Sequence, residues 1–260
     1  MRHARTAVVA ALVLAASGAA LRPAGAAAVV AGREVPPRAY PQVVTIGGAC
    51  TASLIAPDRL VTAGHCADHV EEGRSRVRFA GVPGRFTAVR VVAHPGFRFQ
   101  AATPTEPVRD LALVRLDRPV PGVVPFALAG REPRAGARLR LVGYGTPDPR
   151  RDRFGRIRAA DVVRRSTATC RRALDRAERG QGGLFRARWM LCTQGPTGPP
   201  FASGCYGDSG GPLLRRDRGR WVLVAVDSWG VACGARGGDP EVFARVDVER
   251  PFLTGPLDRD

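Results

Sequence analysis

The chain has 260 residues, and 45% of them are hydrophobic, which is enough to bury the core of one large domain or two small ones. Its formal net charge is +17, and all of the basic charge is arginine because the sequence contains no lysine. No stretch after the N-terminal segment is long and apolar enough to span a bilayer, which excludes a protein with several membrane spans.

Residues 1–28 have the pattern of a secretory signal peptide. Arg2 and Arg5 form a positive region, residues 7–16 are apolar, and the small residues at 24–28 provide cleavage sites. The alternative is a membrane anchor, but a spanning helix needs about 20 apolar residues and this run is shorter. The sequence therefore predicts a secreted, extracellular protein, and its composition and short signal suggest a bacterial source.

Short apolar runs separated by glycine and proline follow from residue 29 onwards. They predict strands within 40–46, 52–63, 76–79, 88–94, 111–116, 138–145 and 221–230. Regular short strands with few helices are typical of an all-β barrel or sandwich.

One helix is predicted over 169–180, with Thr169 as the candidate N-cap and Gly180 at its end. The charged segment 146–156 and the glycine-rich segment 193–204 predict loops.

The arginine surplus has two interpretations. It fits an anionic partner such as nucleic acid or an acidic polysaccharide. It also fits a compositional bias, because arginine, alanine and glycine are all abundant and the arginines are scattered along the chain. The second interpretation is favoured, although the charge still predicts non-specific binding to polyanions.

Six cysteines in a secreted chain predict a disulfide framework, and their number alone leaves the pairing open. A zinc site is the alternative, but the sequence has no C-x-x-C pair and no histidine-rich tract. We therefore expect no metal and no cofactor.

Ser209 lies in the glycine-rich stretch GCYGDSGGP at 204–212. Glycine there lets backbone N–H groups approach a reacting oxygen, although a plain loop can be equally glycine-rich. A serine hydroxyl becomes a good nucleophile when a histidine, oriented by a buried carboxylate, removes its proton. His65, at the end of an apolar run and beside a cysteine, is a candidate base. Asp110, which leads straight into a buried apolar run, is a candidate for the orienting acid.

Five sequence blocks together resemble the trypsin/chymotrypsin family of serine proteases. They are VVAG at 29–32, TAGHC at 62–66, DLAL at 110–113, CYGDSGGP at 205–212 and SWG at 228–230. The blocks stand in the family's order of histidine, aspartate and serine, and the resemblance covers about residues 29–250.

The resemblance implies an all-β fold of two six-stranded antiparallel β-barrels, with one intermediate helix and a short C-terminal segment. The expected division is a signal peptide at 1–28, a first barrel at 29–134 and a second barrel at 135–260, within one peptidase domain at 29–250. The implied activity is that of a secreted serine endopeptidase that forms an acyl-enzyme.

The resemblance also implies roles for the candidate residues. His65 would take the proton of Ser209 and pass it to the leaving amine, while Asp110 would orient the imidazole. The backbone N–H groups of Gly207 and Ser209 would form the oxyanion hole. All six cysteines would be paired, as Cys50–Cys66, Cys170–Cys192 and Cys205–Cys233.

In the family a new N-terminus made by proteolysis pairs with the aspartate beside the nucleophile. Here the matching residues are Val29 and Asp208. Because residues 26–28 are themselves an acceptable signal-peptidase site, we expect little or no pro-segment.

Ser203, six residues before the nucleophile, would form the base of the primary specificity pocket. Cleavage after Arg or Lys usually needs an aspartate there, so this serine indicates a chymotrypsin-like pocket. Gly230 would leave the pocket mouth open, Tyr206 would lie at its rim, and the neighbouring wall would be Ser228 and Trp229.

Glu241 departs from the family, because many relatives carry a glycine at this place. If its side chain points inward, the pocket accepts Lys or Arg beside aromatic residues. If it points away, an apolar slot remains.

Other departures are milder. Gly64 replaces a common alanine before His65, and prolines in the C-terminal segment predict that any terminal helix is short. No acidic residue lies between Glu72 and Glu106, where calcium-binding relatives place their carboxylates, so no calcium is expected there.

Two other classes of function remain as alternatives. One is a binding protein on a protease fold, but inactive relatives usually lack a triad residue and this chain keeps all three. The other is a polyanion-binding protein, which can coexist with protease activity. The expected partners are protein or peptide substrates, without a membrane, and the default state is a monomer.

Overall fold

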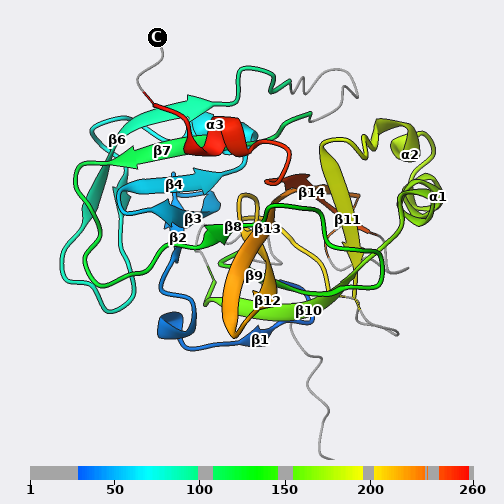
Figure 1. Ribbon diagram of the computed structural model, residues 1–260, viewed down its shortest axis with the longest axis horizontal. Coiled ribbons are helices and arrows are strands. Elements are labelled where there is room, and N and C mark those ends of the chain that lie inside the picture. The colour runs from blue at the N-terminus through cyan, green and yellow to red at the C-terminus, as the bar shows by residue number, and fades with distance from the viewer. Residues whose placement is uncertain are drawn as a thin grey trace, which may run out of the picture.

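The computed structural model describes residues 29–98, 108–145, 155–195, 202–231, 233 and 240–257. The signal peptide predicted at 1–28 lies outside these ranges. Two β-barrels lie side by side, and the few helices pack around them (Figure 1). None of the helices in the described ranges is long and apolar enough to cross a membrane.

The first barrel is a six-stranded sheet in the order β2-β3-β4-β7-β6-β5. Leu54, Leu60, Phe86 and Val114 are buried in its interior, and removing this apolar surface from water favours the closed sheet. The strands are β2 (Val43–Ile46), β3 (Cys50–Ala56), β4 (Arg59–Thr62), β5 (Arg76–Val77), β6 (Phe86–Ala93) and β7 (Ala112–Leu116).

The second barrel closes because β10 pairs with both β9 and β11, at the two ends of the strand order β11-β14-β13-β12-β9. Its strands are β9 (Arg138–Gly143), β10 (Arg158–Arg164), β11 (Met190–Gln194), β12 (Pro212–Asp217), β13 (Arg220–Gly230) and β14 (Glu241–Arg245). The expected pair of six-stranded barrels is confirmed.

Two short strands join the second barrel from the range that was assigned to the first. β1 (Arg33–Glu34) pairs with β10, and β8 (Ala127–Leu128) pairs with β13. The C-terminal segment crosses in the other direction, because the Arg59 guanidinium donates to the carbonyls of Leu253 and Gly255 at 3.0 and 2.9 Å. Contacts in both directions therefore hold the barrels against each other.

The helices are α1 (Thr167–Ala177), α2 (Gln181–Leu184) and α3 (Arg250–Thr254), with 3-10 turns η1 (Pro37–Ala39) and η2 (Gly64–His69). The terminal helix α3 is short, as its proline predicts. It lies above β7 of the first barrel in Figure 1.

The predicted helix exists, but its predicted ends are wrong. Ser166, not Thr169, is the N-cap: the Ser166 hydroxyl accepts a hydrogen bond from the Thr169 backbone N–H at 3.2 Å. The helix ends at Ala177, and Gly180, with φ +92°, provides the left-handed turn into α2.

Replacing Ser166 with alanine should destabilise the protein by about 1 kcal/mol, because the N–H of Thr169 loses its acceptor. The measurement is urea unfolding of the purified chain. Ser166→Asp supplies the same acceptor and should unfold at nearly the parent urea concentration. Equal losses in both variants would show that the cap does not stabilise α1.

Candidate active site

Asp110 is a fully buried carboxylate between the two barrels. Its Oδ2 lies 2.8 Å from Nδ1 of His65 and accepts a 2.6 Å hydrogen bond from the Ser228 hydroxyl. Its Oδ1 accepts the His65 backbone N–H at 2.9 Å. His65 follows β4 of the first barrel and Ser228 lies on β13 of the second, so this carboxylate joins both barrels.

These contacts also set the proton affinity of His65. Burial lowers the pKa of the imidazole, but the hydrogen bond and the negative charge of Asp110 outweigh burial, so the net pKa is raised above its ordinary value. The carboxylate also holds Nδ1 as the protonated ring nitrogen, which makes Nε2 the nitrogen that can accept a proton.

Ser209 lies beside the histidine loop. Its carbonyl accepts the Thr51 N–H at 2.9 Å, and Sγ of Cys66 lies 3.8 Å from the same oxygen. Cys66 directly follows His65 and is bonded to Cys50. The loop that carries Ser209 is therefore held against the loop that carries His65, whose imidazole is paired with Asp110.

The loop around Ser209 needs glycine at two places. Gly207 and Gly210 have φ of +91° and +82°, a backbone region that favours glycine. The Gly207 carbonyl accepts the Thr51 hydroxyl at 2.7 Å, and a Cβ at Gly210 would overlap the Thr62 hydroxyl. The loop conformation is thus fixed by β3 and β4 of the first barrel.

Asp208 is fully buried and accepts three backbone N–H groups, from Val29, Gly145 and Cys205, at 3.0, 2.8 and 3.0 Å. Burial raises the pKa of Asp208 to about 6, although the three donors act in the opposite direction. The structure thus brings Val29 and Asp208 together, and the donor in this unbroken chain is a neutral amide.

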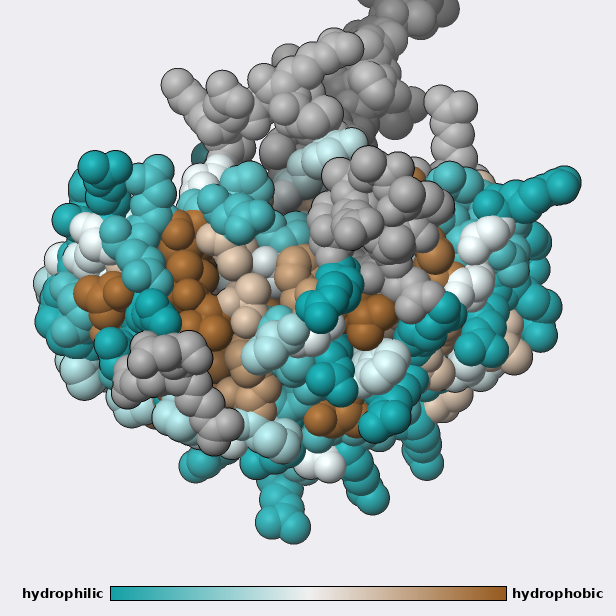
Figure 2. All heavy atoms as spheres, turned by 90° about the horizontal axis from the view of Figure 1, so that it is seen from above, coloured by the Kyte–Doolittle hydropathy of each residue, from teal (hydrophilic) through white to brown (hydrophobic). Residues whose placement is uncertain are grey.

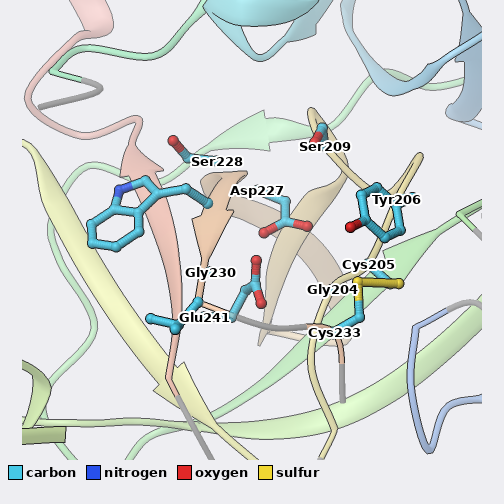
Figure 3. A pocket seen from close by; sticks show the side chains of 11 residues that line it. Gly204, Cys205, Tyr206, Ser209, Asp227, Ser228, Gly230, Cys233 and Glu241 are labelled. Atoms are coloured by element: carbon cyan, nitrogen blue, oxygen red, sulfur yellow. A yellow bond between two sulfur atoms is a disulfide. The ribbon is translucent and has the colours of Figure 1, made fainter. Parts of the chain in front are cut away.

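A cavity of about 170 Å³ opens beside Ser209. Figure 3 shows the side chains around it, and Ser228, Trp229, Gly230 and Glu241 contribute to its lining. Tyr206 also lines it and is 57% exposed.

Ser203 lies apart from that lining. It is 2% exposed, its carbonyl accepts the Val30 N–H at 2.9 Å, and its hydroxyl donates to the Gly204 carbonyl at 3.1 Å. The residue expected at the base of the pocket therefore packs beneath the N-terminal segment, and other polar groups face the cavity.

Two of those groups are carboxyls in contact with each other, Asp227 of β13 and Glu241 of β14. The side chain of Glu241 points inward, and its Oε2 would lie 2.7 Å from a Cβ at Gly230. Sequence reasoning missed Asp227. The available signal was an aspartate inside the apolar run WVLVAVDSWG, where only a partnered or functional acid is tolerated.

Burial raises the pKa of Asp227 well above its ordinary value, and the charges of Glu241 and Asp208 raise it further. Burial also raises the pKa of Glu241, to about 7, with Asp208 adding to the effect. The negative charge of Asp208 therefore raises the pKa of both Asp227 and Glu241, the two acids that line the cavity.

The departure at Gly64 has a steric cause. A Cβ there would lie 2.9 Å from the Phe97 ring and 3.0 Å from Oδ1 of Asp110. An alanine would press on the carboxylate that orients His65, because Phe97 fills the space that a methyl group needs.

Three disulfides hold the site. They support the histidine loop, tie α1 to β11, and join the serine loop to the cavity wall: Cys50–Cys66, Cys170–Cys192 and Cys205–Cys233. These are the pairs that the resemblance implies. In the described ranges, one group of three residues could hold a metal, Cys50, His65 and Cys66, but its two sulfurs are bonded to each other in the first disulfide.

The Trypsin family model matches residues 29–253. The chain belongs to the trypsin family. Its members are serine-type endopeptidases, and the fold agrees with that membership. A solved structure of neuropsin, a serine protease expressed in the limbic system of mouse brain, superposes with a TM-score of 0.67 over 86% of this chain and 97% of neuropsin. At 24% identity, this likeness shows the fold alone.

Curated relatives support the same family. Human Serine protease 56 is 35% identical over 86% of this chain, but the match spans only 38% of the human protein. Trypsin zeta of Drosophila melanogaster is 31% identical over 80% of this chain and 74% of its own length. A trypsin of Saccharopolyspora erythraea is 30% identical over 76% of this chain and 82% of its own length. Most relatives are animal proteins, so the bacterial source suggested by composition is not supported.

Gly64→Ala should lower kcat/KM on peptide substrates by about tenfold to a hundredfold, because a small displacement of the catalytic geometry is costly. The double variant Gly64→Ala/Phe97→Ala removes the clashing ring and should recover most of the loss. Recovery distinguishes steric pressure from a need for glycine itself. If Gly64→Ala alone is as active as the parent, the steric account is wrong.

The raised pKa of Glu241 predicts a pH dependence of stability. The folded pKa of about 7 exceeds the unfolded value of 4.5, so this group stabilises the fold below pH 4.5 and loses that contribution as the pH rises to 7. Across this window the stability of the parent relative to Glu241→Gln should fall by an amount on the order of 3 kcal/mol.

Urea unfolding at both ends of the window measures the difference. The exposed Glu178→Gln is the matched control, and its difference from the parent should change far less. A Glu241→Gln difference that stays constant with pH would contradict the raised pKa.

Proposed function

We propose that this chain is a secreted serine endopeptidase that acts through Ser209, His65 and Asp110. One observation carries the proposal: the buried Asp110–His65 pair meets the Ser209 loop at the junction of two barrels, in a chain of the trypsin family. The chain spans about 40% of the length of the Serine protease 56 relatives, so their full activities are not transferred to it.

In the proposed reaction, Oγ of Ser209 attacks the carbonyl carbon of the scissile peptide while Nε2 of His65 takes the hydroxyl proton. A C–O bond forms, and the carbonyl oxygen becomes an oxyanion. The backbone N–H groups of Gly207 and Ser209 donate hydrogen bonds to it.

The second half of the reaction returns the enzyme to its starting state. His65 gives its proton to the peptide nitrogen as the C–N bond breaks, which leaves an acyl ester on Ser209. Water, deprotonated by the same imidazole, then hydrolyses the ester. Asp110 stays ionised and stabilises the imidazolium in both steps.

Cleavage before Val29 would activate the chain. The amide N–H that lies 3.0 Å from Asp208 would become an ammonium group and would give this buried carboxylate a charged partner. The pKa of Asp208 should then fall, which fixes the ionised form and the loop that carries Gly207. A signal-peptidase cut after residue 28 would produce this state directly, with no pro-segment.

For the primary pocket we propose a mixed preference for apolar or aromatic and basic residues before the scissile bond. Tyr206, Trp229 and Gly230 supply apolar walls and an open mouth, as the sequence suggested. Glu241 supplies negative charge because its carboxyl faces the cavity. Ser203 stands where a strict preference for basic residues would require an aspartate at the base of the pocket.

The expected partners are protein or peptide substrates of a secreted, monomeric enzyme that needs no cofactor. Non-specific polyanion binding is a secondary property rather than a rival function. Exposed arginines such as Arg74, Arg118 and Arg171 are distributed over both barrels. Figure 2 likewise shows hydrophilic side chains spread across the face seen from above, without a single concentrated patch.

Ser209→Ala should abolish cleavage of peptides by a chain that begins at Val29, because the nucleophile is lost. Asp110→Asn should lower kcat by about 10⁴ and move the acidic limb of the pH profile to lower pH, since Asp110 no longer raises the pKa of His65. The exposed Asp161→Asn is the control and should keep parent activity. Cleavage that survives Ser209→Ala would overturn the proposed function.

A further inference from the structure

We propose that Asp227 and Glu241 act together as a specificity switch that binds a proton when the residue before the scissile bond is neutral and releases it when that residue is basic. This inference rests on the proposed endopeptidase function and adds a second acid, Asp227, to the pocket. The enzyme should therefore shift its preference from apolar towards basic residues as the pH rises.

The strand geometry places both carboxyls in the cavity. Asp227 on β13 and Glu241 on β14 belong to paired strands, and the register shifts between Asp227 and Trp229. The intervening Ser228 turns its hydroxyl to Asp110, whereas Asp227 faces Glu241. Figure 3 shows the two carboxyl groups pointing towards each other below Ser209.

The contact between the carboxyls requires a proton. Two ionised carboxylates are acceptors only, so the hydrogen bond between Asp227 and Glu241 forms only when one of them is protonated. Asp227 and Glu241 are 2% and 7% exposed, and water therefore screens their repulsion poorly. Because the pKa of Glu241 is about 7 and that of Asp227 lies well above its ordinary value, the pair in the empty pocket holds one shared proton and one negative charge above about pH 7.

Among the described residues, no cation competes for the pair. Glu241 accepts the Gly204 backbone N–H, Asp227 accepts that of Ser228, and the charged group facing the pair from the serine loop is Asp208, which is also an acid. From β11, the partner strand of β14, the uncharged Thr193 stands opposite Glu241. Within the described ranges no arginine pairs with either acid, so the charge of the pair is not neutralised from within.

One acceptor in the pair is unused. Oδ1 of Asp227 is buried and has no hydrogen-bond partner among the described residues. Gly204 and Gly230 leave space on either side, because a Cβ at these positions would crowd the carboxyls of Asp227 and Glu241. A buried unpaired acceptor beside a cavity matches the ammonium or guanidinium group of a basic side chain, which has several donors and one positive charge.

The charge of the bound side chain then decides whether the pair keeps its proton. A neutral side chain leaves the shared proton in place. An ammonium group that enters the cavity favours two ionised carboxylates, so the pair loses its proton to solvent and the total charge of the filled site stays unchanged. Binding of a basic residue thus releases about one proton, and its preference over a neutral residue should rise by up to about tenfold per pH unit.

The test compares two peptides that differ only in lysine or norleucine before the scissile bond, since norleucine lacks the ammonium group. We expect the ratio of their kcat/KM values to rise between about pH 7.5 and 9, where the pair in the empty pocket holds one proton. The ratio cancels the titration of His65, which both substrates share. Asp227→Asn keeps the shape and the hydrogen bond to Glu241, and its ratio should be nearly independent of pH.

Glu241→Gln should flatten the ratio in the same way, whereas the remote Asp161→Asn should keep the parent slope. A parent ratio that does not change with pH would overturn the inference, and so would a full slope in Asp227→Asn. If neither peptide is cut by a chain beginning at Val29, the proposed function has failed instead.

A binding measurement separates the two failures. Titration calorimetry of the Ser209→Ala variant at about pH 8, above the pKa of Glu241, in buffers of different ionisation enthalpy, counts protons without catalysis. The lysine peptide should release close to one proton per site, and the norleucine peptide should release almost none. Binding of the lysine peptide without proton release would refute the switch whether or not the chain is a peptidase.

Discussion

The buried charge of Asp110 is the constraint on which the arrangement of the two barrels depends. A carboxylate withdrawn from water is stable only with several well-placed donors. Here the donors come from both barrels: two N–H groups of His65 from the first and the Ser228 hydroxyl from the second. Separating the barrels would leave this charge unpaired, so the same interaction that joins them also orients the imidazole. The same hydrogen bonds therefore stabilise the junction and align the proposed catalytic groups. The junction is also stabilised by β1 and β8, which pair with strands of the second barrel, and by the hydrogen bonds from Arg59 to the C-terminal segment.

Asp208 is a second buried acid, and its hydrogen-bond donors differ from those of Asp110. It has three backbone donors and no charged partner in the unbroken chain, so burial leaves its pKa at about 6. Asp110 is hydrogen-bonded by groups of His65 and Ser228, whereas Asp208 would gain a charged partner if the proposed cleavage made the Val29 nitrogen an N-terminal ammonium. Gly207 directly precedes Asp208, so the loop that carries Gly207 lies next to this carboxyl. Coupling a cut at Val29 to the loop thus needs no large movement, because Val29 is already buried next to Asp208.

The sequence alone was sufficient to predict structure where apolar runs recur along the chain or where a family motif spans several residues. Short apolar runs between glycine and proline predicted strand regions that the structure contains, and the resemblance carried by the five ordered blocks predicted the two barrels. Strands β10 and β12 escaped prediction because arginine and aspartate interrupt or end their short apolar runs, and they become strands through pairing with β9 and β13. The cap of α1 was misplaced because Ser166 and Thr169 are both competent caps, and only the backbone conformation separates them. Asp227 shows the limit more clearly: it lines the cavity beside a register shift in β13 that no local pattern encodes.

Asp227 is difficult to explain as a structural residue. A valine or leucine at this place in β13 would bury apolar surface, avoid repulsion from Asp208 and Glu241, and leave no unpaired oxygen. Buried acids that lower stability without a compensating partner are expected where a ligand supplies the partner. Glu241 alone would give the pocket a negative charge above its pKa of about 7, and no second carboxyl would then hold a proton when the bound side chain is neutral. Two carboxyls in contact can hold either charge state at a modest cost, and this makes an acid pair better suited than a single acid to a pocket that accepts both apolar and basic side chains.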